Sequence, residues 1–366
     1  MEKDLISKVR VAFLVDDTRF VLDKYVGAKY GGGRVVLQNV LMQLLELSYS
    51  IDIYTYKDSV NNSLKNVNVF KVVDEKDFNE KFDVSKYTII ITTSTRFGVQ
   101  INYFLQGHSK KSSLLYYPKL IAYVLGKLHK SRLSWEVKSF TPNGDFRSYV
   151  AVSKLVAQDY CTNFGISEDS IRVIYPGCEQ RNELDVIKNK DVITFGIIAN
   201  SSLNKGGHLF LLVVGVLKYL GVEFKVNMIA PKYNDDFLMK YIVLLFGLKK
   251  CLKIFPKQDV MDDFYKSIDC LVMPSKRETF GLVALEAMSF GKPIIISDTT
   301  GICEIIDDKV GFIFKRASIL QFIKVLNKFV KLYVEDFELY EAMCRNAYRL
   351  SQKYTWEAFC EKLLEK

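Results

Sequence analysis

The chain has 366 residues, of which 49% are hydrophobic and 25% charged, and its formal net charge is +9. These values exclude a disordered chain and favour two globular domains of roughly 150–200 residues each. No uninterrupted apolar run reaches the roughly 18 residues that a membrane-spanning helix needs, so we expect a soluble protein that is at most peripheral to a membrane.

The seven cysteines are scattered along the chain, and none of them forms a CxxC pair. This pattern favours reduced thiols over a disulfide framework or a zinc site. The N-terminal stretch also lacks the apolar core and the small-residue cleavage site of a secretory signal. We therefore expect a cytoplasmic location and no bound metal.

Short apolar runs rich in β-branched residues alternate with longer amphipathic runs through the first half of the chain. This alternation is typical of a parallel sheet covered by helices, and it predicts a Rossmann-like domain. The strands expected there are 9–17, 50–56, 87–94, 101–107, 148–153 and 170–177, and the helices are 33–48 and 153–165.

A polar interval at 178–191 interrupts this alternation, and an apolar run at 192–200 restarts it. We expect an interdomain linker at this interval. The predicted architecture is therefore α/β, with two Rossmann-like domains whose parallel sheets face each other across a ligand-binding cleft. Further strands are expected at 224–230, 252–256, 269–275 and 293–298, and further helices at 260–268 and 282–290.

The stretch RETFGLVALEAMSFGKPIIISD, residues 277–298, contains two glutamates, Glu278 and Glu286, that lie eight positions apart. A helix is expected to begin at Gly281 or Leu282, and the free N–H groups of a helix start attract a phosphate, which glycine allows to approach closely. Glu278 lies in the loop and is expected to accept hydrogen bonds from hydroxyl groups. Glu286 lies within the helix and would suit two vicinal ribose hydroxyls.

Taken alone, the two glutamates also fit a helix-start acid and an exposed position on an amphipathic helix. The full pattern PSxxExFGxxxxEAMxxGxP, however, resembles the E-x7-E signature of family 4 glycosyltransferases, which have the GT-B fold. The resemblance implies transfer of a sugar, with retention of configuration and without a metal, from a UDP- or GDP-sugar. The matching residues are Pro274, Ser275, Glu278, Phe280, Gly281, Glu286, Ala287, Met288, Gly291 and Pro293.

The resemblance covers nearly the whole chain and is strongest after residue 148. The segment IIANSSLNKGG is similar to a loop in which a Lys-Gly pair binds the donor diphosphate, and Lys205 and Gly206 match that pair. The implied domains are an acceptor-binding domain at 1–182, a nucleotide-sugar-binding domain at 190–350 and a C-terminal helix at 351–366 that crosses back to the first domain.

The glycine-rich segment YGGGRVVLQNV does not fit a dinucleotide-binding motif, because Val36 stands where the last glycine is needed. It resembles the glycine-rich loop of GT-B transferases, which implies that the amides of Gly32 and Gly33 approach the donor phosphate or the acceptor. A simple loop and helix cap is the alternative. His108 follows an expected strand, and the resemblance implies contact with the transferred sugar, although a lone loop histidine is often structural.

The resemblance thus implies two overlapping sets of site residues. Glu278, His108 and Lys205 are the expected catalytic residues. The residues expected to bind the donor are Gly32, Gly33, Lys205, Gly206, Phe280, Gly281, Leu282 and Glu286.

One position departs from the family pattern. An arginine often stands five or six positions before the lysine, but Ala199 and Asn200 occupy that region here. Because asparagine cannot neutralise charge, either Lys205 acts with helix N-termini alone or another basic residue, such as Arg34, replaces the arginine. A non-catalytic nucleotide-sugar- or carbohydrate-binding protein therefore remains as an alternative. A GT-B sugar-nucleotide epimerase, which shares the fold and the donor, is another.

A basic segment at 109–139 mixes lysines with tyrosines and a tryptophan. Such a mixture suits an anionic membrane surface, although an ordinary solvated helix face fits as well. The expected acceptor is a glycan, a lipid-linked group or a protein. Nucleic acid is not an expected partner, because no recognised nucleic-acid-binding motif is present.

Overall fold

The structure is a computed structural model in which the chain forms two compact units. The first unit is Met1–Pro176 together with Trp356–Lys366, and the second is Gly177–Thr355. The structure describes residues 10–18, 21–22, 32–59, 62–92, 103–105, 149–184, 191–199, 202–255 and 261–365.

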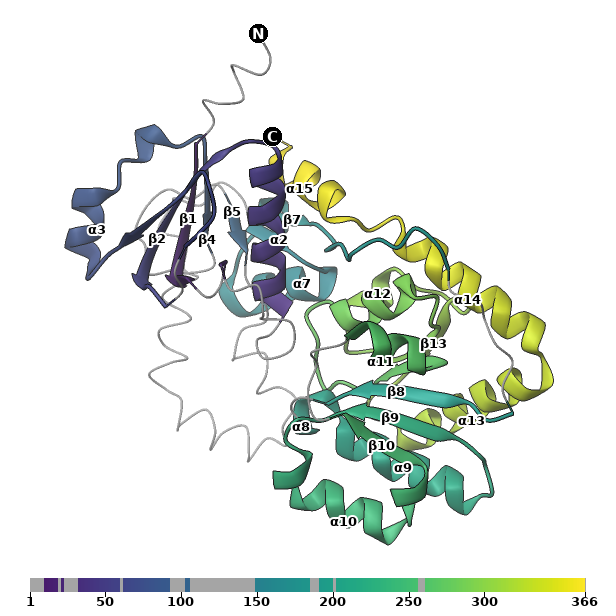
Figure 1. Cartoon of the computed structure of the whole chain (residues 1–366). Helices are drawn as coiled ribbons and strands as arrows, with labels where there is room; N and C mark the ends of the chain where they lie inside the picture. The colour runs from purple at the N-terminus through teal and green to yellow at the C-terminus, as the bar shows by residue number, and fades with distance from the viewer. Residues whose placement is uncertain are drawn as a thin grey trace. The chain divides into compact units, whose positions relative to one another are not determined.

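The first unit is built on a seven-stranded sheet in which every pair of neighbours is parallel (Figure 1). In the order of pairing, the strands are β3 (Val67–Lys71), β2 (Ser50–Lys57), β1 (Arg10–Asp17), β4 (Ile89–Thr92), β5 (Tyr103–Leu105), β6 (Tyr149–Ala151) and β7 (Ile171–Val173). The chain passes from β1 outward to β3 and then returns to β4. The point where the strand order reverses therefore lies between β1 and β4, where such folds bind ligands.

The helices of the first unit cover this sheet with apolar side chains. Phe78 packs with Ala12 and Leu14 of β1 in one buried cluster. Arg172 donates hydrogen bonds to the carbonyl oxygens of Leu363 and Glu365, at 3.4 and 2.9 Å, and thus ties the last helix to β7. Among the described residues of this unit, the helices are α2 (Gly32–Glu46), α3 (Glu75–Lys81), α7 (Lys154–Phe164) and α15 (Trp356–Leu364).

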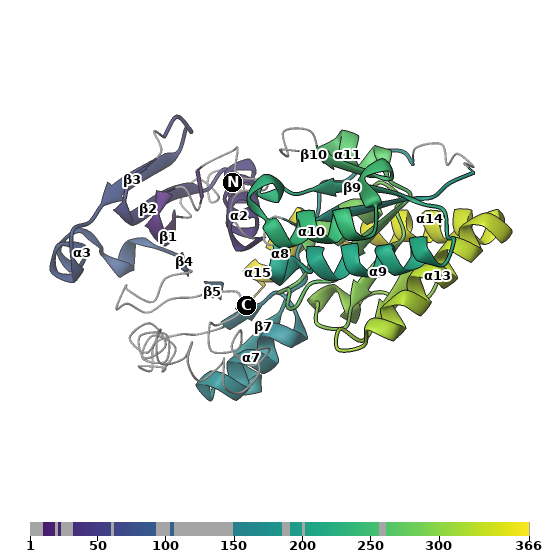
Figure 2. The same cartoon turned by 90° about the horizontal axis from the view of Figure 1, so that it is seen from below.

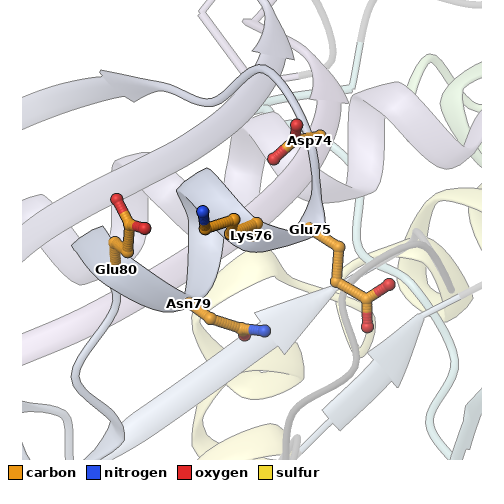
Figure 3. A pocket seen from close by; sticks show the side chains of 5 residues that line it. All are labelled: Asp74, Glu75, Lys76, Asn79 and Glu80. Carbon is orange, nitrogen blue, oxygen red and sulfur yellow. The ribbon is translucent and has the colours of Figure 1, made fainter.

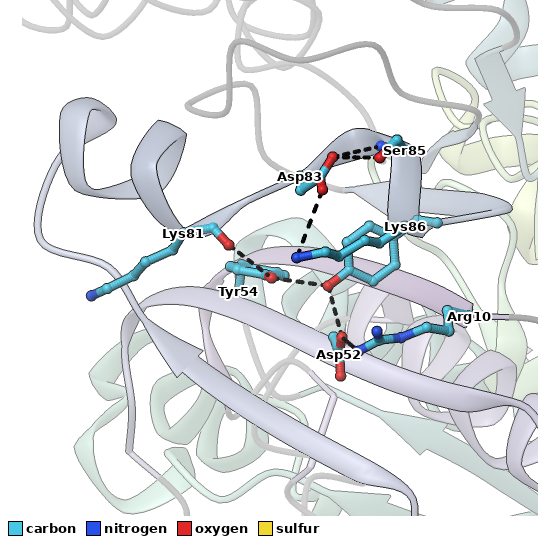
Figure 4. A network of polar contacts seen from close by, with 8 residues as sticks. Arg10, Asp52, Tyr54, Lys81, Asp83, Ser85 and Lys86 are labelled. Carbon is cyan, nitrogen blue, oxygen red and sulfur yellow. Dashed lines mark hydrogen bonds and ion pairs between the residues drawn. The ribbon is translucent and has the colours of Figure 1, made fainter.

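A polar network joins β1, β2 and the residues before β4 near the amino ends of these strands (Figure 4). The buried carboxylate of Asp52 accepts hydrogen bonds from Arg10, Tyr87 and Asn68 at 2.6, 2.7 and 2.8 Å. The Tyr54 and Tyr87 hydroxyls lie 2.9 Å apart, and burial raises the pKa of both phenols. The network lies toward the amino ends of these strands, opposite the carboxyl ends where such sheets bind ligands.

The second unit is built on a six-stranded sheet that is also parallel throughout. In the order of pairing, the strands are β10 (Leu252–Phe255), β9 (Lys225–Ile229), β8 (Thr194–Ile198), β11 (Cys270–Met273), β12 (Ile294–Ser297) and β13 (Gly311–Phe314). The strand order reverses between β8 and β11. The carboxyl ends of these two strands are thus the predicted ligand site of the unit.

Helices lie on both faces of this second sheet (Figure 1). Buried side chains on one face of the sheet form a continuous core with those of the helices that cover it, including Phe210, Met239 and Phe322. The helices of the unit are α8 (Ser202–Lys205), α9 (Gly207–Tyr219), α10 (Phe237–Leu245), α11 (Met261–Ser267), α12 (Leu282–Ser289), α13 (Ile319–Glu335) and α14 (Phe337–Ser351).

The α/β class and the two Rossmann-like sheets are confirmed. The end of the chain differs in detail from the helix expected at 351–366, because α14 ends at Ser351 and α15 begins at Trp356. Between them, the Tyr354 carbonyl accepts the Cys178 N–H at 3.1 Å. This contact joins the residues just after Pro176 to the second unit. The boundary between the units therefore lies between Pro176 and Gly177, whereas the sequence analysis placed the end of the first domain at residue 182.

Candidate functional site

The loop that follows β11 is held by backbone hydrogen bonds to the loop that follows β12. The Glu278 N–H donates to the Thr299 carbonyl at 3.1 Å, and the Glu278 carbonyl accepts the Gly301 N–H at 3.2 Å. The Phe280 carbonyl accepts the Ile302 N–H at 2.7 Å. Because these hydrogen bonds fix the backbone on both sides of Glu278, its side chain projects from a defined point at the carboxyl end of the sheet.

The Phe280 and Gly281 pair places the start of α12. Phe280 is 1% exposed, so its side chain anchors the loop in the core. Gly281 has a φ of 112°, which side chains rarely adopt, and a Cβ there would lie 2.8 Å from Cε of Met273. Gly281 is the N-cap of α12 and has no side chain to accept the first N–H groups of that helix. The N–H groups from Leu282 onward are thus suited to an anion.

The loop that follows β8, which contains the one-turn helix α8, lies directly against the loop that follows β11. The Lys276 N–H donates to the Asn204 carbonyl at 2.7 Å. Gly206, the N-cap of α9, has a φ of 73°, and a Cβ there would lie only 2.1 Å from the Pro274 carbonyl oxygen. Only glycine therefore allows this approach, which brings the N-terminal ends of α9 and α12 to neighbouring strands at the strand-order reversal.

Lys205 and Glu278 form an ion pair across these two loops. The lysine side chain is 33% exposed and the glutamate side chain 16% exposed, so the pair is partly removed from water. Attraction between charges is stronger in such surroundings than at an open surface. The structure thus brings together the two residues that the sequence analysis took from separate motifs.

Glu286 lies in α12, more than one helical turn after Gly281, and its carboxylate faces α11 of the same unit. The Tyr265 hydroxyl donates a hydrogen bond to Glu286 Oε2 at 2.7 Å. Burial raises the pKa of Glu286, the hydrogen bond from Tyr265 lowers it, and the charge of Glu179 raises it further. Burial also raises the pKa of Cys178 to about 12, with a smaller contribution from the charge of Glu286. Tyr265 is a donor to Glu286 that sequence reasoning missed.

Two cations near the Glu278 loop were also missed. Burial lowers the pKa of Lys276, and the positive charge of Arg316 lowers it further. Burial lowers the pKa of Arg316 as well, opposed by the charge of Asp298. The Arg316 N–H donates to Asp298 Oδ1 at 2.9 Å, which places Arg316 after β13 beside the loop that follows β12. No sequence signal marks this pair, because the two residues are 40 positions apart and only the order of the strands brings the charge of Arg316 near Lys276.

The remaining expected residues belong to the first unit or lie outside the described part of the chain. Gly32 and Gly33 form the start of α2, one residue earlier than the expected helix. His108, Asn200 and the basic segment 109–139 lie outside the described residues. Their expected roles stay predictions.

Among the residues that the structure describes, no group of three or more His, Cys, Asp or Glu side chains could hold a metal ion. In the same residues, no helix is long and apolar enough to cross a membrane. A surface hollow lies on α3, and none of the expected site residues lines it (Figure 3). Its lining comes from one short helix and its cap, Asp74, Glu75, Lys76, Asn79 and Glu80.

Comparison with known families bears on the second unit. Residues 179–350 match the family model described as "Glycosyl transferases group 1". The second unit is a group 1 glycosyl transferase domain. Lys205, Gly206, Glu278 and Glu286 all lie within the matched range, so the ion pair and both helix starts belong to this domain.

Curated relatives of the group 1 domain match only part of the chain. An uncharacterized glycosyltransferase of Methanocaldococcus jannaschii is 30% identical over 183 residues, which are 45% of this chain and 46% of that protein. The sulfoquinovosyl transferase SQD2 of Arabidopsis thaliana is 35% identical over 109 residues, which are 29% of this chain and 21% of that protein. The chain thus spans less than half the length of these two relatives.

Solved structures match nearly the whole chain. WaaG, a glycosyltransferase involved in lipopolysaccharide biosynthesis, aligns with a TM-score of 0.73 at 14% identity and covers 96% of this chain and 98% of its own. HepE of Anabaena, in complex with UDP and glucose, aligns with a TM-score of 0.67 at 15% identity and covers 97% and 98%. At such identities the likeness shows the fold, which is GT-B.

Proposed function

We propose that the chain is a glycosyltransferase of the family 4 type, which transfers a sugar from a nucleotide-diphosphate sugar with retention of configuration. The observation that carries the proposal is the Lys205–Glu278 ion pair at the strand-order reversal of the group 1 domain. A cation and a carboxylate held together beside two helix starts suit a substrate that has both phosphates and hydroxyl groups.

The phosphates of the donor would bind to Lys205 and to the first N–H groups of α9 and α12. These groups carry positive charge or partial positive charge, and they are fixed before the donor arrives. They stabilise the negative charge that develops on the diphosphate as it leaves, and such stabilisation is usually the largest contribution to catalysis. In this proposal the leaving phosphate itself takes the proton from the acceptor, and no metal is needed.

The two glutamates would hold the two sugars of the donor. Glu278 accepts hydrogen bonds from hydroxyl groups of the transferred sugar, and Glu286 accepts them from the ribose. When the donor phosphates engage Lys205, the carboxylate of Glu278 becomes available to the sugar. His108, Gly32 and Gly33 are proposed to contact the sugar and the phosphates from the first unit, which is proposed to bind the acceptor.

Lys276 and Arg316 are proposed to supply the positive charge that is lacking at Ala199 and Asn200. Two partly buried cations repel each other, and an anion placed between them relieves that repulsion. Lys276 precedes Glu278 by two positions, and its N–H is bound to the loop of Lys205. Lys276 therefore lies beside the proposed diphosphate site, and Arg316, whose backbone N–H binds Asp298, is proposed to approach it from the loop after β12.

The donor is proposed to be a UDP- or GDP-sugar, and UDP is favoured because HepE, which shares the fold, is solved with UDP and glucose. The proposed acceptor is a glycan, a lipid-linked group or a protein. The test is the release of UDP or GDP from a panel of UDP- and GDP-sugars by the full chain, together with calorimetric binding of the same donors. Turnover of at least one donor supports the proposal.

A non-catalytic binding protein is the second candidate, because of the residues at 199 and 200. It predicts that a donor binds but that no nucleotide is released with any acceptor. A sugar-nucleotide epimerase would instead convert the donor into its epimer, which chromatography of the nucleotide sugars would detect. The panel thus separates all three activities.

A further inference from the structure

One face of α10 exposes five large apolar side chains to solvent. They recur at the spacing of a helical face, three or four residues apart, and thus form one continuous strip, here called the α10 stripe. Its members and their exposed fractions are Phe237 (79%), Leu238 (49%), Tyr241 (53%), Leu244 (80%) and Leu245 (61%).

The outward orientation of the stripe is fixed by the opposite face of α10. Met239, Ile242 and Val243 are buried in the core of the second unit. At the start of the helix, the Asp236 carboxylate accepts the Met239 N–H at 3.0 Å and lies 3.1 Å from His208 Nε2 of α9. The stripe therefore belongs to an anchored helix, and rotation of α10 cannot bury it.

The far end of α10 is anchored to α9 as well, and the two helices lie side by side (Figure 2). The Lys218 ammonium donates to the Gly247 carbonyl oxygen. Gly215 of α9 lies so close to the Phe246 ring that a Cβ there would be 2.4 Å from it. These contacts bring Tyr219 and Leu220, which are 88% and 64% exposed, to the end of the stripe.

Exposed lysines flank the α10 stripe in the sequence. The segment 218–253 has seven lysines and three acids, Glu223, Asp235 and Asp236, a net charge of +4. The Asp236 carboxylate already caps α10 and contacts His208. The lysines that are exposed beside α9 and α10 are Lys218, Lys232, Lys240, Lys249 and Lys250.

We propose that the α10 stripe is a docking surface for an anionic lipid membrane. Aromatic and aliphatic side chains enter the boundary between headgroups and acyl chains, while lysines around them contact anionic headgroups. A second copy of the chain fits less well, because a two-fold contact would bring the lysines of both copies together. With nine residues, α10 is about 13 Å long and would lie in the plane of the membrane.

The proposal does not depend on glycosyl transfer, and it concerns a surface different from the segment 109–139. It is tested with the full chain by flotation with vesicles of phosphatidylcholine alone or with about 30% phosphatidylglycerol. The paired change Phe237→Ser/Leu244→Ser removes apolar contacts, and Lys249→Glu/Lys250→Glu reverses charge. We expect each pair to weaken binding to anionic vesicles at least about tenfold.

Matched control variants lie on α13 of the same unit. Leu320 is 73% exposed, so Leu320→Ser removes a comparable apolar side chain, and Lys324→Glu/Lys331→Glu makes the same change of charge. Both controls are expected to bind as the unchanged chain does. Melting temperatures of all variants should agree, since every changed residue is exposed.

Three outcomes would overturn the proposal. The first is no binding to anionic vesicles, and the second is binding that the α10 variants leave unchanged while Lys110→Glu/Lys111→Glu abolishes it. The third is a dimer in sedimentation that Phe237→Ser/Leu244→Ser dissociates, without vesicle binding, which would assign the stripe to a second copy of the chain.

Discussion

Lys205 and Glu278, which are 73 positions apart in the sequence, form an ion pair where the loops after β8 and β11 meet. The two loops are also joined through their backbones, by the hydrogen bond between the Lys276 N–H and the Asn204 carbonyl. The pair is therefore held by the fold itself, and the same arrangement that forms it defines the proposed site for the donor.

Replacing Lys205 should affect donor binding more than stability. Lys205→Ala removes the only side-chain cation supplied by the family's Lys-Gly pair, so we expect the dissociation constant of UDP to rise at least about tenfold. The loss of stability should be about 1 kcal/mol, because the ion pair is partly exposed. Calorimetric titration with UDP measures the first quantity and urea denaturation the second. Lys331→Ala, on α13, is the control, and equal UDP affinity in both variants would contradict the role of Lys205.

A side chain at position 206 should destabilise the fold, because Gly206 lies against the Pro274 carbonyl oxygen. Gly206→Ala would cost about 1–2 kcal/mol for the left-handed backbone and about 1–3 kcal/mol more for the contact with the Pro274 carbonyl oxygen. Gly221→Ala is a matched control, because Gly221 has a similar φ of 79° but nothing within 4 Å of the added Cβ. Urea denaturation should show the larger loss for Gly206→Ala. If the two losses are equal, the contact between the loops is not a source of stability.

The partly buried carboxylate of Glu286 should make stability depend on pH. Burial raises the pKa of Glu286 above the ordinary value of 4.5. At a pH between these two values, the folded chain therefore keeps a proton that the unfolded chain has lost. The free energy of unfolding therefore falls as pH rises from about 4.5 through the raised pKa. Glu286→Gln removes this dependence. The melting temperature of this variant, minus that of the unchanged chain, should therefore increase as the pH rises from 4 to 7.5. A difference that stays constant over this range would show that Glu286 ionises freely in the folded chain.

The proposed cation pair can be tested at Arg316. Arg316→Gln removes the charge near Lys276, so the affinity for UDP should fall about five- to tenfold, while the affinity for uridine without phosphates should not change. Arg345→Gln is the control, because Arg345 pairs with Glu341 on the surface of α14. An equal loss for UDP and uridine would place Arg316 elsewhere than at the phosphates.

Strong local patterns predicted the parts of the fold and site that depend on neighbouring residues in the sequence. The run CLVM and the Phe280-Gly281 pair predicted a buried strand, a loop and a helix start, and the structure has β11 and α12 there. The edge strand β3 was missed because its residues beyond Val67 are mostly not buried, so its apolar signal is weak.

Contacts between distant segments could not be predicted in this way. Tyr265 reaches Glu286 from α11, and Arg316 reaches the Asp298 loop from the end of β13, because of the order in which strands pair. The sequence of α10, FLMKYIVLL, is apolar nearly all round and does not reveal which side is exposed. Only the packing of α10 on α9 decides that.

The most direct test of the proposed function is the rate of nucleotide release with Glu278→Gln. This change keeps the size of the side chain but removes the charge, so it should abolish release of UDP or GDP from the donor that the unchanged chain uses. Folding should be intact by circular dichroism, and the exposed Glu338→Gln should release nucleotide at the unchanged rate. A folded Glu278→Gln variant that releases nucleotide as fast as the unchanged chain would contradict the role of Glu278.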